Sequence, residues 1–353
     1  EEIDYEIEAR NAEKFADLFE NNSLVTIPKV ERMYSSRKVI TTSWIDGTKL
    51  KSREELIERS LNPTAIIKTG VTSAIQQLLE FGYFHADPHP GNMFALKENK
   101  KKSELKGNLA YVDFGMMDEI SNEDRLTLTG AIVHLINQDF EALSLDFQSL
   151  GFLSKDKDPK PIAPILKEVL GGSLGEEVIN FNFKSITDKF SELMFDYPFR
   201  VPPRFALIIR AVVSQEGLAL KLDPEFKIIG IAYPYVAKRI ITGETDELVD
   251  ILLDVIFDKN GNLQLDRIES LLKVISNDLQ NDNNDLIELA KSSFSLLISG
   301  TGETLRRNLL LSIIKNDRIS TSDFKALVKI IRKTFSLNRL AGALIQSFNP
   351  LAA

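Results

Sequence analysis

The stretch "HADPHPGN" at residues 85–92 combines side chains that can handle phosphate and a metal ion. Asp87 is followed five residues later by Asn92, and Asp113 stands farther along in "VDFG". Magnesium prefers oxygen ligands such as carboxylates and amides, and phosphoryl transfer also needs a carboxylate near the attacking hydroxyl. The order Asp, Asn, Asp is the order that this chemistry requires. The motif therefore predicts a site for phosphoryl transfer.

Two short strands are expected to bring these side chains together. "NMFAL" and "LAYVDF" read as strands on either side of a polar connector, "KENKKKSELKGN", so Asn92 and Asp113 return to one place. Pro88 and Pro90 stiffen the loop, and Gly91 permits a sharp turn. Asp-Pro and Pro-Gly are also plain turn formers. A turn alone would not require the asparagine or the downstream Asp-Phe-Gly, so we favour the functional interpretation.

The remaining elements are expected to be mainly helical. An amphipathic helix opens the chain with apolar residues at helical spacing, namely Ile3, Ile7, Phe15, Leu18 and Phe19. No capping residue is expected before its first turn, which predicts a fragment whose N-terminal part is missing. "SLVTIPKV" and "RKVITTSWI" read as strands, and "DGTKL" reads as a turn.

Helices are expected over residues 52–59 and 63–81, and from Ser121 almost to the end of the chain. Ser121 is the expected N-cap of the first of these later helices, with Asp124 as its capping partner.

The composition limits the class of protein. The 353 residues are 43% hydrophobic and 27% charged, as in a folded chain with a sizeable core. A net charge of -8 offers no overall basic field for nucleic acid. The absence of cysteine excludes disulfides and thiolate metal sites. No apolar run reaches the roughly 20 residues that a membrane span needs.

The motifs together resemble the UbiB-type atypical kinases, also called aarF-domain or ADCK kinases. The resemblance rests on "EEIDYEIEARNAEKF", "WIDG", "FGYFHADPHPGNMF" and "YVDFGM", and it covers about residues 1–230. It implies ATP with Mg²⁺ or Mn²⁺ as cofactors. It places Asp87 at the catalytic-loop position and makes Asn92 and Asp113 the metal ligands.

The same resemblance assigns residues in the first part of the chain. Glu2 and Asp4 match the family's Glu-x-Asp signature, and Glu8 matches the helix glutamate that pairs with the ATP-binding lysine. The segment Ser43, Trp44 and Ile45 is the implied hinge whose backbone meets the adenine. That lysine, an alanine-rich nucleotide loop and a Lys-x-Gly-Gln signature are missing from this chain and are expected before Glu1. The chain by itself is therefore expected to bind ATP weakly or not at all.

The implied fold is α+β and mainly α, a protein-kinase-like fold with a truncated N-lobe. Residues 1–50 are the residual N-lobe, 51–232 the C-lobe, and 233–353 a helical C-terminal extension. The family also implies a role in prenylquinone metabolism, peripheral to a membrane, in the cytoplasm or an organelle. The implied partners are a nucleotide and a lipid or prenylquinone precursor, with no nucleic acid, and the oligomeric state is left open.

Two local features concern the substrate. An arginine precedes the catalytic aspartate in ordinary protein kinases, whereas Ala86 stands here, and only "MMDEI" separates Gly115 from Ser121. Both features disfavour a protein substrate. A small-molecule phosphotransferase of the aminoglycoside or choline kinase type is an alternative, as is a pseudokinase scaffold that binds nucleotide or lipid without turnover.

Other motifs are weaker. His85 and His89 are expected to anchor the loop rather than to act as acids or bases. "DKNGNLQLDRIE" resembles a calcium loop, but Leu263 stands where the loop needs glycine, so we expect a helix–turn–helix linker. The lysine-rich connector between Lys97 and Lys106 is a solvated tip or a contact for anionic lipid.

Overall fold

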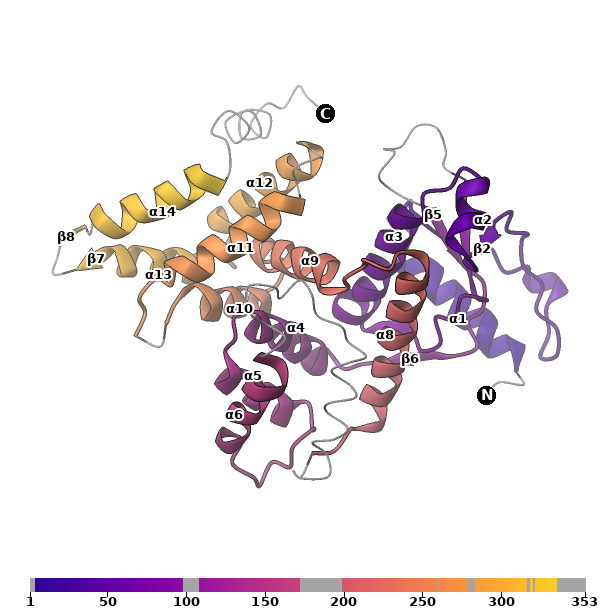
Figure 1. The fold of residues 1–353 in the computed structure, drawn as a ribbon, viewed down its shortest axis with the longest axis horizontal. Helices are drawn as coiled ribbons and strands as arrows, with labels where there is room; N and C mark the ends of the chain where they lie inside the picture. The colour runs from indigo at the N-terminus through magenta and orange to yellow at the C-terminus, as the bar shows by residue number, and fades with distance from the viewer. Residues whose placement is uncertain are drawn as a thin grey trace. The chain divides into compact units, whose positions relative to one another are not determined.

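The computed structural model describes residues 4–97, 108–171, 199–258, 260–278, 283–315, 318–319 and 321–334 (Figure 1). These residues are mostly helical with a small mixed sheet, which confirms the α+β, mainly α, class. The chain divides into two compact units, Glu1–Ala232 and Tyr233–Ala353. Within the described ranges, no helix is both long and apolar enough to span a bilayer.

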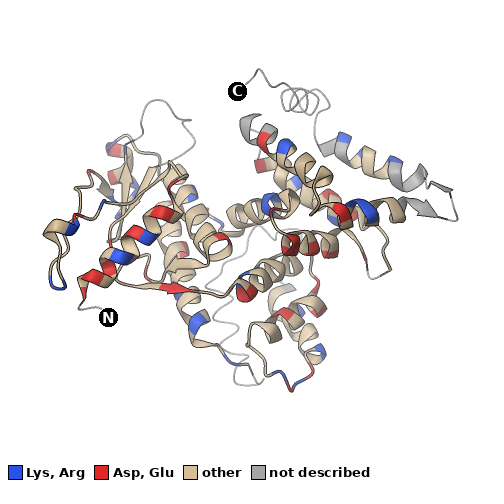
Figure 2. Cartoon of the chain, turned by 180° about the vertical axis from the view of Figure 1, so that it is seen from behind, with Lys and Arg blue, Asp and Glu red and all other residues tan. Residues whose placement is uncertain are grey.

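Helix α1 (Tyr5–Leu18) begins at a capped end. Asp4 is the N-cap: its Oδ1 accepts the Glu6 N–H at 3.1 Å, and Arg37 Nε lies 3.2 Å from Asp4 Oδ2. The expectation that no capping residue precedes this helix is therefore wrong, because the helix starts after Asp4 and does not run through it. Figure 2 shows the positions of acidic and basic residues interspersed along the ribbon of α1. Its buried residues are Ala9, Ala12 and Phe15.

The strands that follow α1 are much shorter than expected. Strand β1 is Val25–Thr26, a 3₁₀ turn η1 occupies Arg32–Tyr34, and residues 37–45 contribute only isolated bridges. The expected turn "DGTKL" instead contains strand β2 (Thr48–Lys49). Strand propensity needs a partner strand and burial, and the Val39 side chain is 54% exposed.

The main sheet has the order β1-β5-β4-β2. Strands β4 (Met93–Leu96) and β5 (Asn108–Tyr111) pair antiparallel, which confirms the expected strand pair. Strand β1 runs parallel to β5, and β2 runs antiparallel to β4. The last three residues of β5 are fully buried.

A second, two-stranded sheet was not expected from the sequence. Strand β3 (Tyr83–His85) pairs antiparallel with β6 (Met117–Glu119), with His85 opposite Met117. Each strand is only three residues long, shorter than the run of four to eight residues by which a strand is recognised in a sequence.

The other elements of the first unit are mostly helices. They are α2 (Arg53–Glu58), α3 (Pro63–Gln76), α4 (Asn122–Ile136), α5 (Phe140–Ser149), α6 (Ala163–Leu166) and α8 (Pro203–Leu222). Short π-helical or 3₁₀ segments are η2 (Gln77–Phe81), η3 (Lys160–Ile162) and η4 (Lys167–Gly171). The expected cap of α4 is confirmed, since Ser121 Oγ accepts the Asp124 N–H at 3.0 Å. Helix α3 contacts both α8 and β5.

The described part of the second unit is helical apart from one short strand pair. Its elements are α9 (Ile229–Thr242, which begins before the boundary), α10 (Asp246–Ile256), α11 (Leu265–Asp278), α12 (Asn283–Ile298), α13 (Glu303–Ile313), β7 (Ile314–Lys315), β8 (Arg318–Ile319) and α14 (Thr321–Thr334). Strands β7 and β8 were not expected. The segment between α10 and α11 is the expected helix–turn–helix linker, with Gly261 at φ 78°.

Candidate functional site

The loop at residues 85–92 is closed by its own hydrogen bonds. The His89 N–H donates to the Asp87 carbonyl at 2.7 Å, and the Asn92 N–H donates to the His89 carbonyl at 2.8 Å. The Gly91 N–H donates to His89 Nδ1 at 3.1 Å, and the Asp87 N–H donates to His85 Nδ1 at 3.1 Å. Both histidines therefore anchor the loop by accepting backbone N–H groups, as expected.

Two strand pairs bring together the segments that carry Asp87, Asn92 and Asp113. Met93 of β4 lies opposite Tyr111 of β5, and one position beyond, the Val112 N–H donates to the Asn92 carbonyl at 3.1 Å. Asn92 thus lies opposite Val112, the residue that precedes Asp113. In the second pair, the Ala86 N–H donates to the Met116 carbonyl at 2.9 Å. This contact ties the residue before Asp87 to the segment after Asp113.

The Asp-Phe-Gly segment joins the two sheets. Asp113 Oδ1 accepts the Gly115 N–H at 3.0 Å, so the carboxylate is held against its own backbone. The Phe114 side chain is buried, and its ring centroid lies 5.3 Å from that of Phe15 on α1. The aromatic contact fixes this segment against the helix.

Glu8 lies beside the Asp-Phe-Gly segment. Its Oε1 accepts the Phe114 N–H at 3.4 Å. Burial raises the pKa of Glu8 above its ordinary value, and the charge of Asp113 raises it further, while the hydrogen bond from Phe114 opposes both effects. The carboxylates of Glu8 and Asp113 thus repel one another where Glu8 is half-buried. A bound cation would relieve that repulsion. The pairing of Glu8 with a lysine stays a prediction.

By residue type, Asn92 and Asp113 are groups that could hold magnesium. Among the described residues, no group of three or more His, Cys, Asp or Glu side chains is arranged to hold a metal ion. Asn92 and Asp113 instead offer two hard oxygen ligands. Mg²⁺ is commonly held by one or two protein ligands together with substrate phosphates and water, so a two-residue set is sufficient.

A buried polar layer lies under the loop. Gln77, at the start of η2, accepts the His85 backbone N–H at 2.9 Å and is 3% exposed. The Tyr111 hydroxyl lies 2.8 Å from Ser73 Oγ. Burial raises the pKa of Tyr111, and hydrogen bonds to Ser73, Gln77 and Gln215 oppose that rise. These contacts connect α3, β5 and α8 to the loop.

The His85 imidazole belongs to the same layer. Burial lowers the pKa of His85, although the backbone of Asp113 and the charges of Asp113 and Asp87 favour the protonated ring. Its Nε2 is buried and makes no well-aligned hydrogen bond. A largely desolvated, neutral ring suits the anchoring role.

The expected hinge residues Ser43, Trp44 and Ile45 lie before β2. Lys29 N–H donates to Ser43 Oγ at 2.9 Å, and Ser43 N–H donates to the Lys29 carbonyl at 2.8 Å. Trp44 is 89% exposed, and Ile45 is half-buried. The contact of this hinge with adenine stays a prediction. Asp4 of the signature caps α1, and Glu2 lies outside the described residues.

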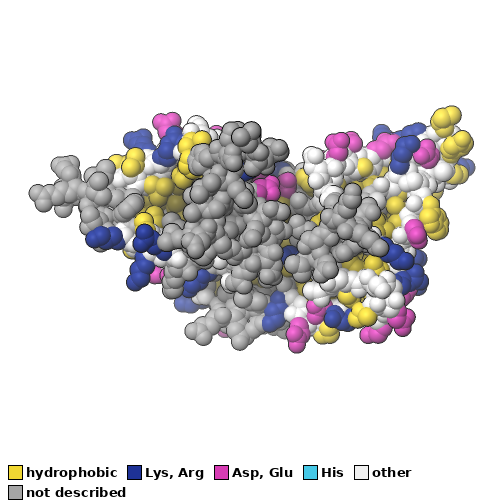
Figure 3. Space-filling model, turned by 90° about the horizontal axis from the view of Figure 1, so that it is seen from above, with side chains coloured by type: hydrophobic (Ala, Val, Ile, Leu, Met, Phe, Trp, Pro, Cys, Tyr) yellow, Lys and Arg dark blue, Asp and Glu magenta, His cyan; other side chains and the backbone are white. Residues whose placement is uncertain are grey.

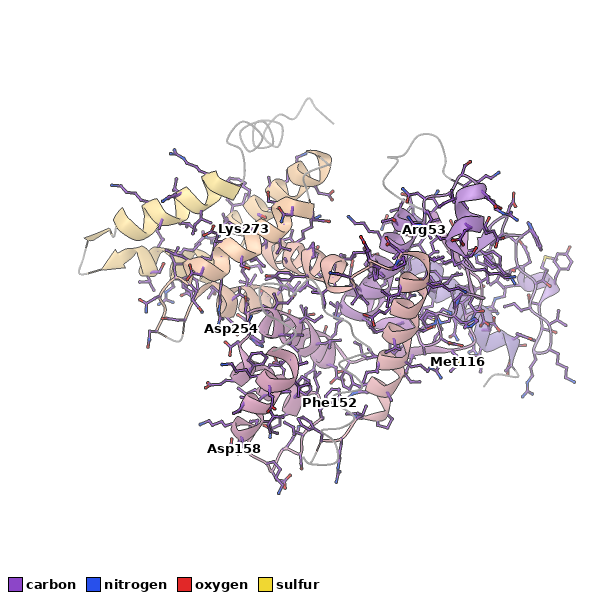
Figure 4. The ribbon with its side chains drawn as sticks, in the orientation of Figure 1. Arg53, Met116, Phe152, Asp158, Asp254 and Lys273 are labelled. Atoms are coloured by element: carbon purple, nitrogen blue, oxygen red, sulfur yellow. The ribbon has the colours of Figure 1, made fainter. Side chains whose placement is uncertain are left out.

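Two polar residues at the site were missed by sequence analysis. Asn11 Nδ2 donates to the Phe114 carbonyl at 2.9 Å. Arg210 Nη2 donates to the Ala86 carbonyl at 3.2 Å and lies 3.7 Å from the sulfur of Met116, which Figure 4 labels. The signal for Asn11 was its place three residues after Glu8, on the same helix face. Nothing in the sequence around Arg210 pointed to the loop.

Comparisons with known proteins agree with these observations. Residues 1–145 match the model of the ABC1 atypical kinase-like domain. The Synechocystis protein slr1919 is 47% identical over 340 residues, which are 96% of this chain and 58% of that protein. The chloroplastic protein ACTIVITY OF BC1 COMPLEX KINASE 3 of Arabidopsis thaliana is 37% identical over 349 residues, which are 99% of this chain and 47% of that protein.

A further relative, the chloroplastic ACTIVITY OF BC1 COMPLEX KINASE 1 of Arabidopsis thaliana, is 34% identical over 98% of this chain and 51% of its own length. The chain thus spans about half the length of these relatives. A solved structure, that of Rv3197 with erythromycin from Mycobacterium tuberculosis, matches 63% of this chain and 55% of its own chain, at 21% identity and a TM-score of 0.44. The motifs and the relatives together show that the chain belongs to the UbiB (aarF-domain, ADCK) family of ABC1 atypical kinase-like proteins.

Proposed function

We propose that the chain is the kinase-like part of a UbiB-type atypical kinase or ATPase that uses ATP with Mg²⁺ or Mn²⁺. In this proposal, the first unit is a protein-kinase-like fold with a truncated N-lobe, and the second is its helical extension. The observation that carries the proposal is the pairing of β4 with β5, since it sets Asn92 opposite Val112, the residue that precedes Asp113.

Each residue at the loop has a proposed role. Asn92 and Asp113 hold the metal, which when bound offsets charge on the ATP phosphates. Asp87 orients the acceptor hydroxyl or a water molecule and takes its proton. The backbone of Ser43, Trp44 and Ile45 meets the adenine. The hydrogen bonds that close the loop support these roles, because they keep Asp87 and Asn92 at fixed positions relative to one another.

The proposed setting is prenylquinone metabolism of the ubiquinone or plastoquinone type, at the periphery of an organellar or cytoplasmic membrane. Arabidopsis relatives that carry the name chloroplastic support an organellar location. The proposed partners are the nucleotide and a lipid or prenylquinone precursor. The short connection from Gly115 to Ser121, which contains strand β6, supports a small acceptor over a docked peptide.

The test compares ATP binding and ATP turnover, with and without Mg²⁺, on the full-length polypeptide that the gene encodes. Asp113→Asn is expected to lose metal-dependent nucleotide binding, because it removes the charged ligand. Asp87→Asn is expected to bind nucleotide and lose turnover. Asp118→Asn is the matched control, since Asp118 lies on β6 and its Oδ1 accepts the Glu119 N–H at 2.8 Å.

Equal ATP turnover by the wild-type protein and by the Asp87 and Asp113 variants would contradict the site assignment. Binding without turnover in the wild-type protein would favour the scaffold alternative.

A further inference from the structure

One face of α1 holds the Asp-Phe-Gly segment through three side chains. Glu8, Asn11 and Phe15 follow one another at intervals of three and four residues, which places them on the same side of a helix. All three contact Phe114: Glu8 accepts its N–H at 3.4 Å, Asn11 donates to its carbonyl at 2.9 Å, and the two phenylalanine rings lie 5.3 Å apart.

The backbone of Phe114 depends on these side chains. Strand β5 ends at Tyr111 and β6 begins at Met117, so Phe114 belongs to neither ladder. Buried backbone groups need hydrogen-bond partners, and here the partners of both polar groups of Phe114 come from α1. The same helix reaches β6 as well, because Lys14 forms an ion pair with Glu119.

The hydrogen bond from Asn11 extends its effect to Asp113 through one peptide group. The Phe114 carbonyl and the Gly115 N–H belong to the same planar unit, so fixing one fixes the direction of the other. The Gly115 N–H in turn donates to Asp113 Oδ1 at 3.0 Å. Asn11 therefore sets the donor that orients the Asp113 carboxylate. Gly115 has no Cβ, so its own backbone restricts this peptide group less than another residue would, and the bond from Asn11 supplies part of the missing restraint.

We infer that Asn11 is a positioning residue for the metal ligand Asp113, acting through the peptide group between Phe114 and Gly115. The inference rests on the proposed function, in which Asp113 binds Mg²⁺. Partners that orient metal ligands typically contribute about 10-fold to 100-fold to metal affinity. Asn11 acts on the Asp113 carboxylate and not on the nucleotide. A substitution at Asn11 is therefore expected to change the Mg²⁺ concentration that the enzyme requires, and not its requirement for ATP.

The experiment measures ATP turnover as a function of Mg²⁺ concentration in the full-length polypeptide. Asn11→Ala is expected to raise the KM for Mg²⁺ by about 10-fold, the lower end of the range for such partners. Asn11→Asp keeps the shape of the side chain but replaces the donor by an acceptor, so its KM is expected to rise at least as far. The KM for ATP at saturating Mg²⁺ is expected to change much less.

Asn22→Ala is the matched control. Asn22 follows the same helix, and its Nδ2 donates to Gln76 Oε1 at 3.0 Å, away from Phe114. The KM for Mg²⁺ of the Asn22→Ala protein is expected to equal that of the wild-type protein. A second measurement needs no nucleotide: amide hydrogen exchange at Gly115 is expected to be faster in Asn11→Asp than in the wild-type or Asn22→Ala protein.

The outcomes separate the inference from the proposed function. A wild-type protein whose turnover depends on Mg²⁺, together with Asn11 variants of unchanged KM for Mg²⁺, overturns the inference alone. A wild-type protein without metal-dependent turnover overturns the proposed function and this inference with it. If Asn11→Ala fails to fold, Asn11→Asp and the exchange rate at Gly115 decide the question.

Discussion

Gln77 is a buried residue that holds the start of the loop at residues 85–92. Its side-chain oxygen accepts the buried His85 N–H at 2.9 Å. Gln77→Leu would leave that N–H without an acceptor inside the protein. Loss of one partner of a buried hydrogen bond costs about 1–3 kcal/mol. We therefore expect Gln77→Leu to lower the free energy of unfolding by that amount, measured by denaturant titration.

Gln76→Leu is the control for this prediction. Gln76 is half-buried, and its partner Asn22 Nδ2 can turn to water. The prediction for Gln77 is wrong if the two variants unfold at the same denaturant concentration.

The site residues that sequence analysis identified differ from those that it missed in how far along the chain their partners lie. Asp87 and Asn92 share one short motif, and Asp113 carries its own. Asn11, in contrast, bonds to a residue 103 positions away, and Arg210 to one 124 positions away. A hydrogen bond between residues so far apart in the chain forms only once the backbone has folded. Neither residue type nor local spacing therefore predicts it.

Helices were predictable because their signals are local. Asn62 caps α3 with Pro63 at its first position, and Ser121 caps α4. The short strands were not predictable, since β2, β3 and β6 have two or three residues and are defined by their partners across the ladder. The second ladder, which ties Ala86 to Met116, therefore emerged only from the structure.

The turn between α10 and α11 gives a prediction about pH. Asp258 Oδ1 accepts the backbone N–H groups of Asn260 and Asn262, both at 2.8 Å. The side chain and the backbone of Asn262 hold the pKa of Asp258 below its ordinary value. The resulting stabilisation is present above the unfolded-state pKa and is lost as the pH falls through the folded-state pKa. Asn262→Ala is expected to raise the pKa of Asp258, measured by carboxyl-carbon NMR titration, and an unchanged value would contradict the assignment.

The same turn is expected not to bind calcium with micromolar affinity. Leu263 stands where a calcium loop needs glycine, and the oxygens of Asp258 are already engaged by Asn262. Calorimetric titration is expected to show no micromolar site. A micromolar site that Glu269→Gln abolishes would show the opposite.

At the scale of the whole molecule, the distribution of charge affects whether the protein binds to a membrane surface. The net charge is -8, and the face seen in Figure 3 carries side chains of both signs among exposed hydrophobic ones. The expected basic tip from Lys97 to Lys106 lies almost entirely outside the described residues. We expect peripheral binding to anionic vesicles that weakens as salt rises past about 0.1 M, where the screening length is about 10 Å. Liposome co-sedimentation across a salt series measures it.

Replacing Lys100, Lys101 and Lys102 by Glu is expected to weaken this binding further. A protein that stays in the supernatant with both anionic and neutral vesicles would refute membrane association and favour a soluble phosphotransferase. If the protein binds and the triple variant is unchanged, the tip is only a solvated loop. Exposed leucines on α13, Leu310 and Leu311, then become the surface to test.

The central claim is that Asn92 and Asp113 share one metal ion beside Asp87. The most direct measurement is a crystal structure of the full-length protein with Mn²⁺ and a non-hydrolysable ATP analogue, in which anomalous scattering locates the metal. The account predicts a peak at bonding distance, about 2.0–2.3 Å, from both the Asn92 side-chain oxygen and the Asp113 carboxylate. A bound nucleotide whose metal contacts neither residue would contradict it.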